Sequence, residues 1–243
     1  MKKTIVLMYH NIGIPPKGTT FPGLHVTPRM FRFQMWYLKA TGFKVVPLKE
    51  ILSFIQGEVP DENLAVITFD DGYQDFYDNA YPILKAYGYP STVFLVSDLV
   101  GKENLWDCDK VRARKKLIDW KSILKLSAEG IIFGSHSKTH PFLSTLSKKD
   151  MTAEVKDSKS FLEEKLQLPV DFFCYPYGDY DKGVMDMSRE AGYKGALTTR
   201  RGLVHRNDNP FEIHRSLIRN TTHPLLFMLR LHTNYEDRRR RVR

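Results

Sequence analysis

The chain has 243 residues, 42% of them hydrophobic and 12% aromatic, which is enough for a complete core and is typical of one domain. It holds 37 Lys and Arg against 28 Asp and Glu, and five arginines fall within residues 238–243. A solvated tail therefore explains much of the net charge of +9. We expect a domain over residues 1–235 and a basic, disordered tail over 236–243 that is suited to anionic surfaces. No recognition motif predicts a specific nucleic-acid partner.

The start of the chain imitates a signal peptide but reads better as a strand. Residues 1–8 are basic and then apolar, but Tyr9 and His10 interrupt the run and no small-residue cleavage site follows. No stretch approaches the ~20 apolar residues of a membrane span. We expect a cytoplasmic protein, or one of the cell envelope if a targeting segment is missing from this sequence. Cys108 and Cys174 match no metal or disulfide pattern.

Predicted strands and helices alternate along the chain. Apolar and β-branched runs predict strands over residues 4–9, 43–48, 64–69, 91–96, 131–134, 171–175, 195–199 and 213–218. Apolar periodicity, capping residues and terminal glycines predict helices over residues 28–41, 49–56, 75–87, 121–129, 148–162, 182–191 and 224–231. Residues 11–28 read as a long irregular connection, and the charged stretch 98–120 as a surface excursion.

This alternation predicts an α/β fold with parallel strands and crossover helices, for which a (β/α) barrel is the natural closure. In such barrels the chemistry gathers at the carboxyl ends of the strands. His10, the Asp70-Asp71 pair, His136 and the segment Tyr175-Pro176-Tyr177 all follow predicted strands. We therefore expect these groups to converge on one rim.

The pair Asp70-Asp71 stands where the buried run 64–69 ends, directly before Gly72. Two adjacent carboxylates repel each other unless a cation or a shared proton intervenes. We interpret the pair as one metal ligand and one separate base. An Asp-Gly turn with two solvated acids is the alternative that the pair alone leaves open.

A second polar cluster follows the predicted strand 131–134. His136 and His140 are four residues apart, a spacing that chelates a divalent ion. Pro141 disfavours helical geometry at His140, so we expect a tight loop. Two histidines and one carboxylate leave coordination positions open for water and substrate, as catalytic metal sites do. Two surface histidines in a loop rich in Ser and Thr are the alternative.

Four motifs together resemble a known family. Residues 68–72 (TFDDG), His136-Ser137-x-x-His140, residues 175–178 (YPYG) and the opening 8–12 (MYHNI) are similar to the polysaccharide deacetylase family of NodB-type, carbohydrate esterase family 4 domains. The resemblance covers nearly the whole chain. It implies a single-domain distorted (β/α)7 barrel that removes acetyl groups from amino sugars, usually in polymers such as chitin, peptidoglycan or poly-N-acetylglucosamine. It also implies a divalent metal, most often zinc, with cobalt, nickel or iron as alternatives.

The same resemblance implies roles for individual residues. Asp70 matches the general base, while Asp71, His136 and His140 match the metal ligands. The segment Tyr175-Pro176-Tyr177 matches a substrate-binding motif in which a main-chain amide near Tyr177 stabilises the oxyanion.

Two positions depart from the family pattern. The motif arginine that orients the base is replaced by Cys174, and we expect Arg215 to substitute for it. Strand alternation then directs His214 to the opposite face. The general acid remains open between His10, which we slightly prefer, and His205 or His214; a buried core histidine is the alternative for His10.

These observations favour a metal-dependent hydrolase that acts on a carbon–nitrogen amide bond of an acetylated glycan. Two alternatives stay open. One is an amide hydrolase of the same fold with a small non-sugar substrate. The other is a catalytically impaired carbohydrate-binding protein, for which the missing motif arginine at Cys174 is the supporting feature.

Overall fold

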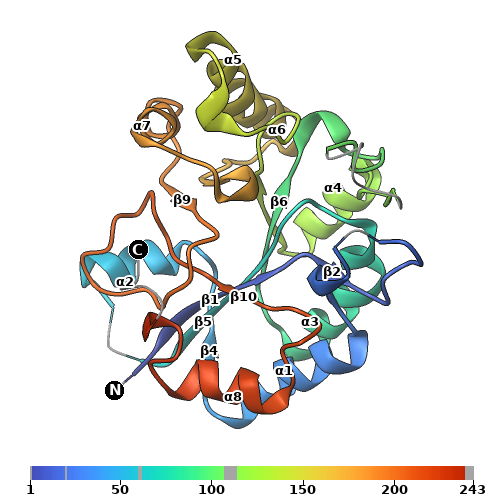
Figure 1. Ribbon diagram of the computed structural model, residues 1–243, viewed down its shortest axis with the longest axis vertical. Helices are drawn as coiled ribbons and strands as arrows, with labels where there is room; N and C mark the ends of the chain where they lie inside the picture. The colour runs from blue at the N-terminus through green and yellow to red at the C-terminus, as the bar shows by residue number, and fades with distance from the viewer. Residues whose placement is uncertain (1, 20, 60–61, 107–113, 239–243) are drawn as a thin grey trace.

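The computed structural model describes residues 2–19, 21–59, 62–106 and 114–238. Its main feature is a curved parallel sheet in the order β10-β1-β5-β6-β7-β8-β9, with β4 also paired to β5 (Figure 1). The strands are β1 (Thr4–Tyr9), β4 (Lys44–Val45), β5 (Leu64–Phe69), β6 (Thr92–Leu95), β7 (Ile132–Ser135), β8 (Phe172–Cys174), β9 (Gly195–Leu197) and β10 (Ser216–Leu217).

The segment that leads into β10 joins the two edges of this sheet. Ile213 forms a parallel bridge with Leu197 at the end of β9, and its backbone N–H donates to the Ala196 carbonyl at 3.0 Å. Three residues later, Ser216 pairs with Leu7 of β1. The expected fold, a single-domain distorted (β/α)7 barrel, is therefore confirmed.

The helices surround this sheet (Figure 1). They are α1 (Pro28–Ala40), α2 (Glu50–Gln56), α3 (Tyr81–Tyr87), α4 (Trp120–Ala128), α5 (Lys148–Thr152), α6 (Ser158–Leu166), α7 (Lys182–Glu190) and α8 (Pro224–His232). Several begin at predicted capping residues; the side chains of Thr27 and Ser147 accept from Met30 and Asp150 backbone N–H groups. Most observed elements lie within one or two residues of their predicted ranges, but β4 and β10 are shorter than predicted. The helix predicted over 75–87 begins with a π-helical turn (Phe76–Ala80) before α3, and the helix predicted over 148–162 is interrupted by another (Ala153–Asp157) and extends to Leu166.

The residues of β5 show how the sheet positions a polar site. All six residues from Leu64 to Phe69 are buried. Ala65, Ile67 and Phe69 belong to one apolar cluster, and Leu64 and Val66 belong to another. Side chains alternate between the two faces of a strand, so Asp70 continues the row of Leu64 and Val66.

Two connections differ from the prediction. Within the irregular stretch 11–28, β2 (Asn11–Ile12) pairs in parallel with β3 (His25–Val26). The charged stretch 98–120 is not simply a surface excursion. Bridges join Glu103 to Lys116 and Tyr73 to Leu117, so this stretch is tied to the chain directly after Asp71.

The predicted boundary at residue 236 is too early. The Glu236 side chain is completely buried and lies against Arg201 and Arg230, and Asp237 accepts a 3.0 Å hydrogen bond from the Leu203 N–H. The packed part of the chain thus includes both acids because their charges are paired. The basic residues 239–243 and Cys108 lie outside the described residues. Within the described ranges, no helix has the length and apolar character needed to cross a membrane.

Candidate active site

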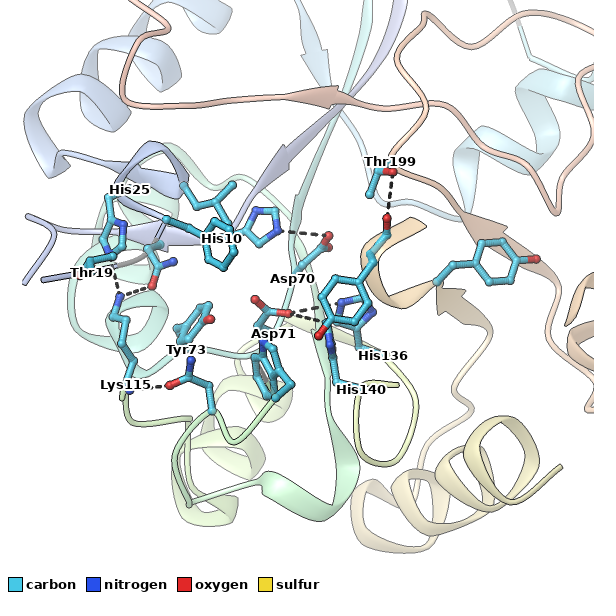
Figure 2. Close-up of a pocket in the computed structure, with 17 residues that line it drawn as sticks. His10, Thr19, His25, Asp70, Asp71, Tyr73, Lys115, His136, His140 and Thr199 are labelled. Carbon is cyan, nitrogen blue, oxygen red and sulfur yellow. Dashed lines mark hydrogen bonds and ion pairs between the residues drawn. The ribbon is translucent and has the colours of Figure 1, made fainter. Parts of the chain in front are cut away.

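Side chains from the strand ends meet in one pocket. The pocket-lining residues include His10 after β1, Asp70 and Asp71 after β5, and His136 and His140 after β7. Figure 2 shows the two aspartates in the middle, with His10 beside Asp70 and with His136 and His140 beside Asp71. The expected convergence on one rim is what the structure shows.

Asp70 is held by Arg215 through two parallel hydrogen bonds. Both nitrogen–oxygen distances, Nη1 to Oδ1 and Nη2 to Oδ2, are 2.7 Å, and both side chains are buried. The guanidinium also donates from Nε to the Thr198 carbonyl at 2.9 Å and from Nη2 to the Cys174 thiol at 3.1 Å. Arg215, directly before β10, thus reaches the carboxylate from another part of the sheet than Cys174 at the end of β8, and the Cys174 thiol contacts the guanidinium.

These contacts control the protonation of both groups. Burial raises the pKa of Asp70, but the charge and hydrogen bonds of Arg215 outweigh burial, and the net pKa is lowered. Asp70 is therefore a carboxylate at neutral pH. Burial raises the pKa of the Cys174 thiol and keeps it neutral.

Asp71, His136 and His140 form a compact, buried set whose ligand atoms lie within 4.8 Å of one another. The Nδ1 of His136 is 2.7 Å from the Cys174 carbonyl oxygen. Because a carbonyl only accepts, Nδ1 must donate, and in a neutral ring Nε2 is then an acceptor. That Nε2 faces the Asp71 Oδ1, also an acceptor, at 3.3 Å, and the His140 Nε2 lies 3.5 Å from the same oxygen.

This arrangement fits a divalent cation. Facing acceptor atoms repel unless a proton or a cation lies between them. Against the effect of burial, Asp71 accordingly raises the pKa of His136. Ligands of a tetrahedral ion with bonds of about 2.1 Å are about 3.4 Å apart, close to the observed separations. A second possible set, Asp70 with His136 and Cys174, fits less well, since Arg215 already occupies the carboxylate and the thiol.

The backbone is in the left-handed region at Asp71 and at two positions of the loop that carries His140. Asp71, Ser137 and His140 all have positive φ angles, of 74°, 65° and 68°. L-residues adopt this region at a cost that surrounding contacts must offset, and such residues cluster at functional sites. The His140 N–H donates to the Ser137 hydroxyl at 3.0 Å. The predicted tight loop is therefore present, and no helix forms between the two histidines.

Among the three candidates for the general acid, His10 is the one that lines the pocket in the described structure. Its Nε2 lies 4.0 Å from the Asp70 Oδ2. Burial lowers its pKa, against the opposing effect of both aspartates. His205 instead pairs with Asp237 at 2.9 Å on an exposed surface, and His214 is not among the lining residues.

The three residues of the segment Tyr175-Pro176-Tyr177 differ in whether and how they line the pocket. The Tyr175 hydroxyl donates to the Phe211 carbonyl at 3.1 Å, and its ring is fully buried, so only part of this residue can border the pocket. Pro176 is buried and does not line the pocket. Tyr177 lines it, with a φ of 58° and its ring edge against His140. A substrate-binding role remains a prediction, and Tyr177 is the residue best placed for it.

The sequence did not predict the residues that line the pocket across from His136 and His140 (Figure 2). There the Lys115 Nζ lies 3.1 Å from the His25 Nε2 (Figure 2). It also donates to the Asn11 side chain and lies 2.9 Å from Asp75. From the same excursion, Trp106 stacks on His140 with ring centroids 4.6 Å apart. These contacts join residues distant in the chain, and a tryptophan in a charged stretch was the one available signal.

Fold and site together define a hydrolase of the barrel type with a possible Asp/His metal centre. Residues 57–196, more than half of the chain, match the family model described as polysaccharide deacetylase. The chain belongs to the polysaccharide deacetylase family, as its motifs indicated.

Individual relatives agree with this assignment. The chain is 29% identical to the Bacillus subtilis (strain 168) protein YxkH over 88% of this chain and 70% of that protein. It is also 29% identical to the poly-beta-1,6-N-acetyl-D-glucosamine N-deacetylase of Staphylococcus aureus (strain MRSA252), over 79% of this chain and 67% of that enzyme. The structure of the Streptococcus pyogenes deacetylase PplD in complex with acetate superposes with a TM-score of 0.82 at 27% identity, covering 95% of this chain and 98% of that one.

Proposed function

We propose that the protein hydrolyses the N-acetyl groups of amino sugars in a polysaccharide, breaking the amide C–N bond to give acetate and a free amine. The observation that carries this proposal is that Asp70, held from behind by the buried Arg215, lines the same pocket as the separate set of Asp71, His136 and His140. A carboxylate held ionised next to a possible metal centre is the arrangement that water activation requires.

We propose zinc as the ion, because two histidines and one carboxylate are typical of catalytic zinc sites. Asp71, His136 and His140 would hold it. When bound, such an ion acts as a Lewis acid that makes water a better nucleophile and polarises the acetyl carbonyl. The Cys174 carbonyl supports this set by fixing the tautomer of His136.

The other residues have roles that follow from their positions. Asp70 accepts the proton from water, and Arg215 keeps its carboxylate ionised and oriented. The Tyr177 main-chain N–H is the proposed donor to the oxyanion that develops on the acetyl oxygen. His10, on the Asp70 side of the pocket, donates the proton that the departing amine needs.

The first substrate to test is poly-β-1,6-N-acetylglucosamine, which the similar Staphylococcus aureus enzyme is named for. The experiment combines metal analysis of the purified protein with acetate release from β-1,6-linked and β-1,4-linked N-acetylglucosamine oligomers, O-acetylated sugars and small cyclic amides. Acetate from the N-acetylated oligomers supports the proposal. Turnover of the cyclic amides alone would favour the small-substrate hydrolase.

The non-catalytic alternative loses its supporting feature. It rested on the absence of a motif arginine at Cys174, and Arg215 supplies the guanidinium that contacts Asp70. This alternative would be favoured again if the purified protein contained no metal, bound glycans and released no acetate.

A further inference from the structure

Two aromatic rings, those of Phe142 and Tyr177, lie beside the proposed metal centre, and the hydrolysis proposed above gives no role to either ring. Phe142 stacks on Tyr177 with centroids 4.2 Å apart and planes inclined by 10°. Tyr177 in turn presents its ring to His140 at 4.5 Å. Phe142 does not line the pocket itself, and 50% of it is exposed. The side of the Phe142 ring turned away from Tyr177 is therefore the exposed apolar face of this stack, which begins at the pocket with Tyr177.

This ring pair is held in place by its neighbours. The Ser144 N–H and hydroxyl each donate to Asp179 at 2.8 Å, which ties the loop after Phe142 to the loop after Tyr177. The Phe142 carbonyl accepts from the Thr145 hydroxyl at 2.7 Å. The surface is thus organised before any ligand arrives, and organisation in advance reduces the entropic cost of binding.

We propose that Phe142, supported by Tyr177, forms a subsite for the sugar unit next to the one that is deacetylated. This inference rests on the proposed function and adds to it the preference for a polymer over a single sugar. The axial C–H groups of a β-linked hexosamine form an apolar face that packs on an aromatic ring. A chain whose reacting unit lies in the pocket brings its neighbouring unit to the Phe142 ring, one ring beyond Tyr177.

The sharpest test compares two lengths of one glycan. For the glycan that gives the highest rate, kcat/KM of Phe142→Ser is measured with two substrates: the pentamer and the methyl glycoside of the single sugar. Loss of the ring should lower the ratio of kcat/KM for pentamer over monosaccharide by roughly three- to tenfold, mainly through KM for the pentamer. Phe142→Trp should restore the ratio.

Leu168→Ser is the matched control. Leu168 is 53% exposed and lies between α6 and β8, at the amino ends of the strands and away from the pocket. Its variant should keep the wild-type ratio. An unchanged ratio in Phe142→Ser, including equal losses for both substrates, would overturn the proposed subsite.

A binding measurement separates this inference from the proposed function. In the Asp70→Asn background, calorimetric dissociation constants for pentamer and monosaccharide report the subsite without turnover. Absence of acetate release by the wild-type protein would contradict the proposed function. A pentamer preference that Phe142→Ser lowers by the same roughly three- to tenfold factor would still support the subsite, and a preference that it leaves intact would overturn it.

Discussion

Two neighbouring aspartates have different partners, and this difference is the basis of the site. Asp70 lies on the inner face of the barrel and receives both arms of Arg215, while Asp71 turns through a positive φ toward two histidines. One carboxylate is therefore neutralised by an arginine, and the other faces two imidazoles with which it forms the proposed metal site. Adjacent acids can take separate tasks in this way without titrating as a shared pair.

Exchanging each aspartate for asparagine should separate the two tasks. Asp71→Asn should lose most bound metal and all measurable acetate release, because a neutral amide is a poor ligand beside two imidazoles. Asp70→Asn should keep its metal and lose about 100-fold or more in kcat. Metal content by mass spectrometry and acetate release on the same preparations provide the check. Loss of metal in Asp70→Asn would show that the assignments are reversed or shared.

The pKa of Asp70 gives a pH prediction. The charge of Arg215 lowers this pKa below its usual value near 3.8, while burial raises it. In Arg215→Met burial is opposed only by the smaller effects of His10 and His136, so the pKa of Asp70 should rise above its wild-type value. A general base works only when ionised, and the acid limb of kcat/KM should therefore move to higher pH. Arg215→Lys, which keeps a charge, should move it less, and an acid limb that stays in place in both variants would contradict the orienting role.

At the scale of elements, the strand ends and the turns after them position the chemistry. The turn after β8 carries Tyr177 and Gly178, both with positive φ, and packs on Thr199 after β9. A Cβ added to Gly178 would lie 1.9 Å from the Thr199 hydroxyl oxygen. The two turns are therefore fitted so closely that the main chain at Tyr177 depends on a glycine at this position.

Gly178→Ala tests this fit against a glycine of similar backbone. Gly88 has a φ of 66°, and a Cβ there would meet nothing within 4 Å. Gly88→Ala should cost about 1 kcal/mol of unfolding free energy for the left-handed conformation alone. Gly178→Ala should cost more and should also reduce acetate release, because relief of the clash moves the Tyr177 amide. Urea unfolding measures the loss of stability in both variants, and acetate release measures their activity. Equal effects of the two variants would contradict the dependence of the Tyr177 main chain on a glycine at position 178.

At the scale of the whole molecule, the barrel is closed by residues near the end of the chain. Glu236 is fully buried, and its carboxylate accepts from the Ser216 hydroxyl at 3.0 Å and from Arg201, while the Arg230 Nε lies 3.2 Å away. Ser216 directly follows Arg215. The last described residues thus stabilise the strand that brings the guanidinium to Asp70.

Glu236→Gln should lower the unfolding free energy by about 3 kcal/mol, because it leaves two partly buried guanidinium groups without their carboxylate. Glu190→Gln is the control, since Glu190 is 58% exposed and lies 3.6 Å from Lys156; such a surface pair should change stability by less than about 0.5 kcal/mol. Urea unfolding measures both. A Glu236 variant as stable as the control would show that the closure depends on other contacts.

The sequence by itself determined the secondary-structure elements and the order of the polar motifs along the chain. Local signals were sufficient for β5, for α1 with its Thr27 cap, and for the positions of Asp70 and His136 after buried strands, because turn residues, caps and apolar periodicity act over a few residues. The gathering of Asp71, His136 and His140 was predictable for the same reason: strand ends of a parallel barrel share one rim.

Only the tertiary structure decided which distant groups meet. Arg215 and Asp70 are 145 residues apart, and their bidentate geometry depends on the closure between β9 and β1. The position of His10 in the pocket and of His205 outside it, the Lys115 network and the stacking of Trp106 on His140 follow from packing between segments, which no local pattern records. Long-range contacts of this kind depend on the whole barrel, because each is made by side chains that only the closed sheet brings together.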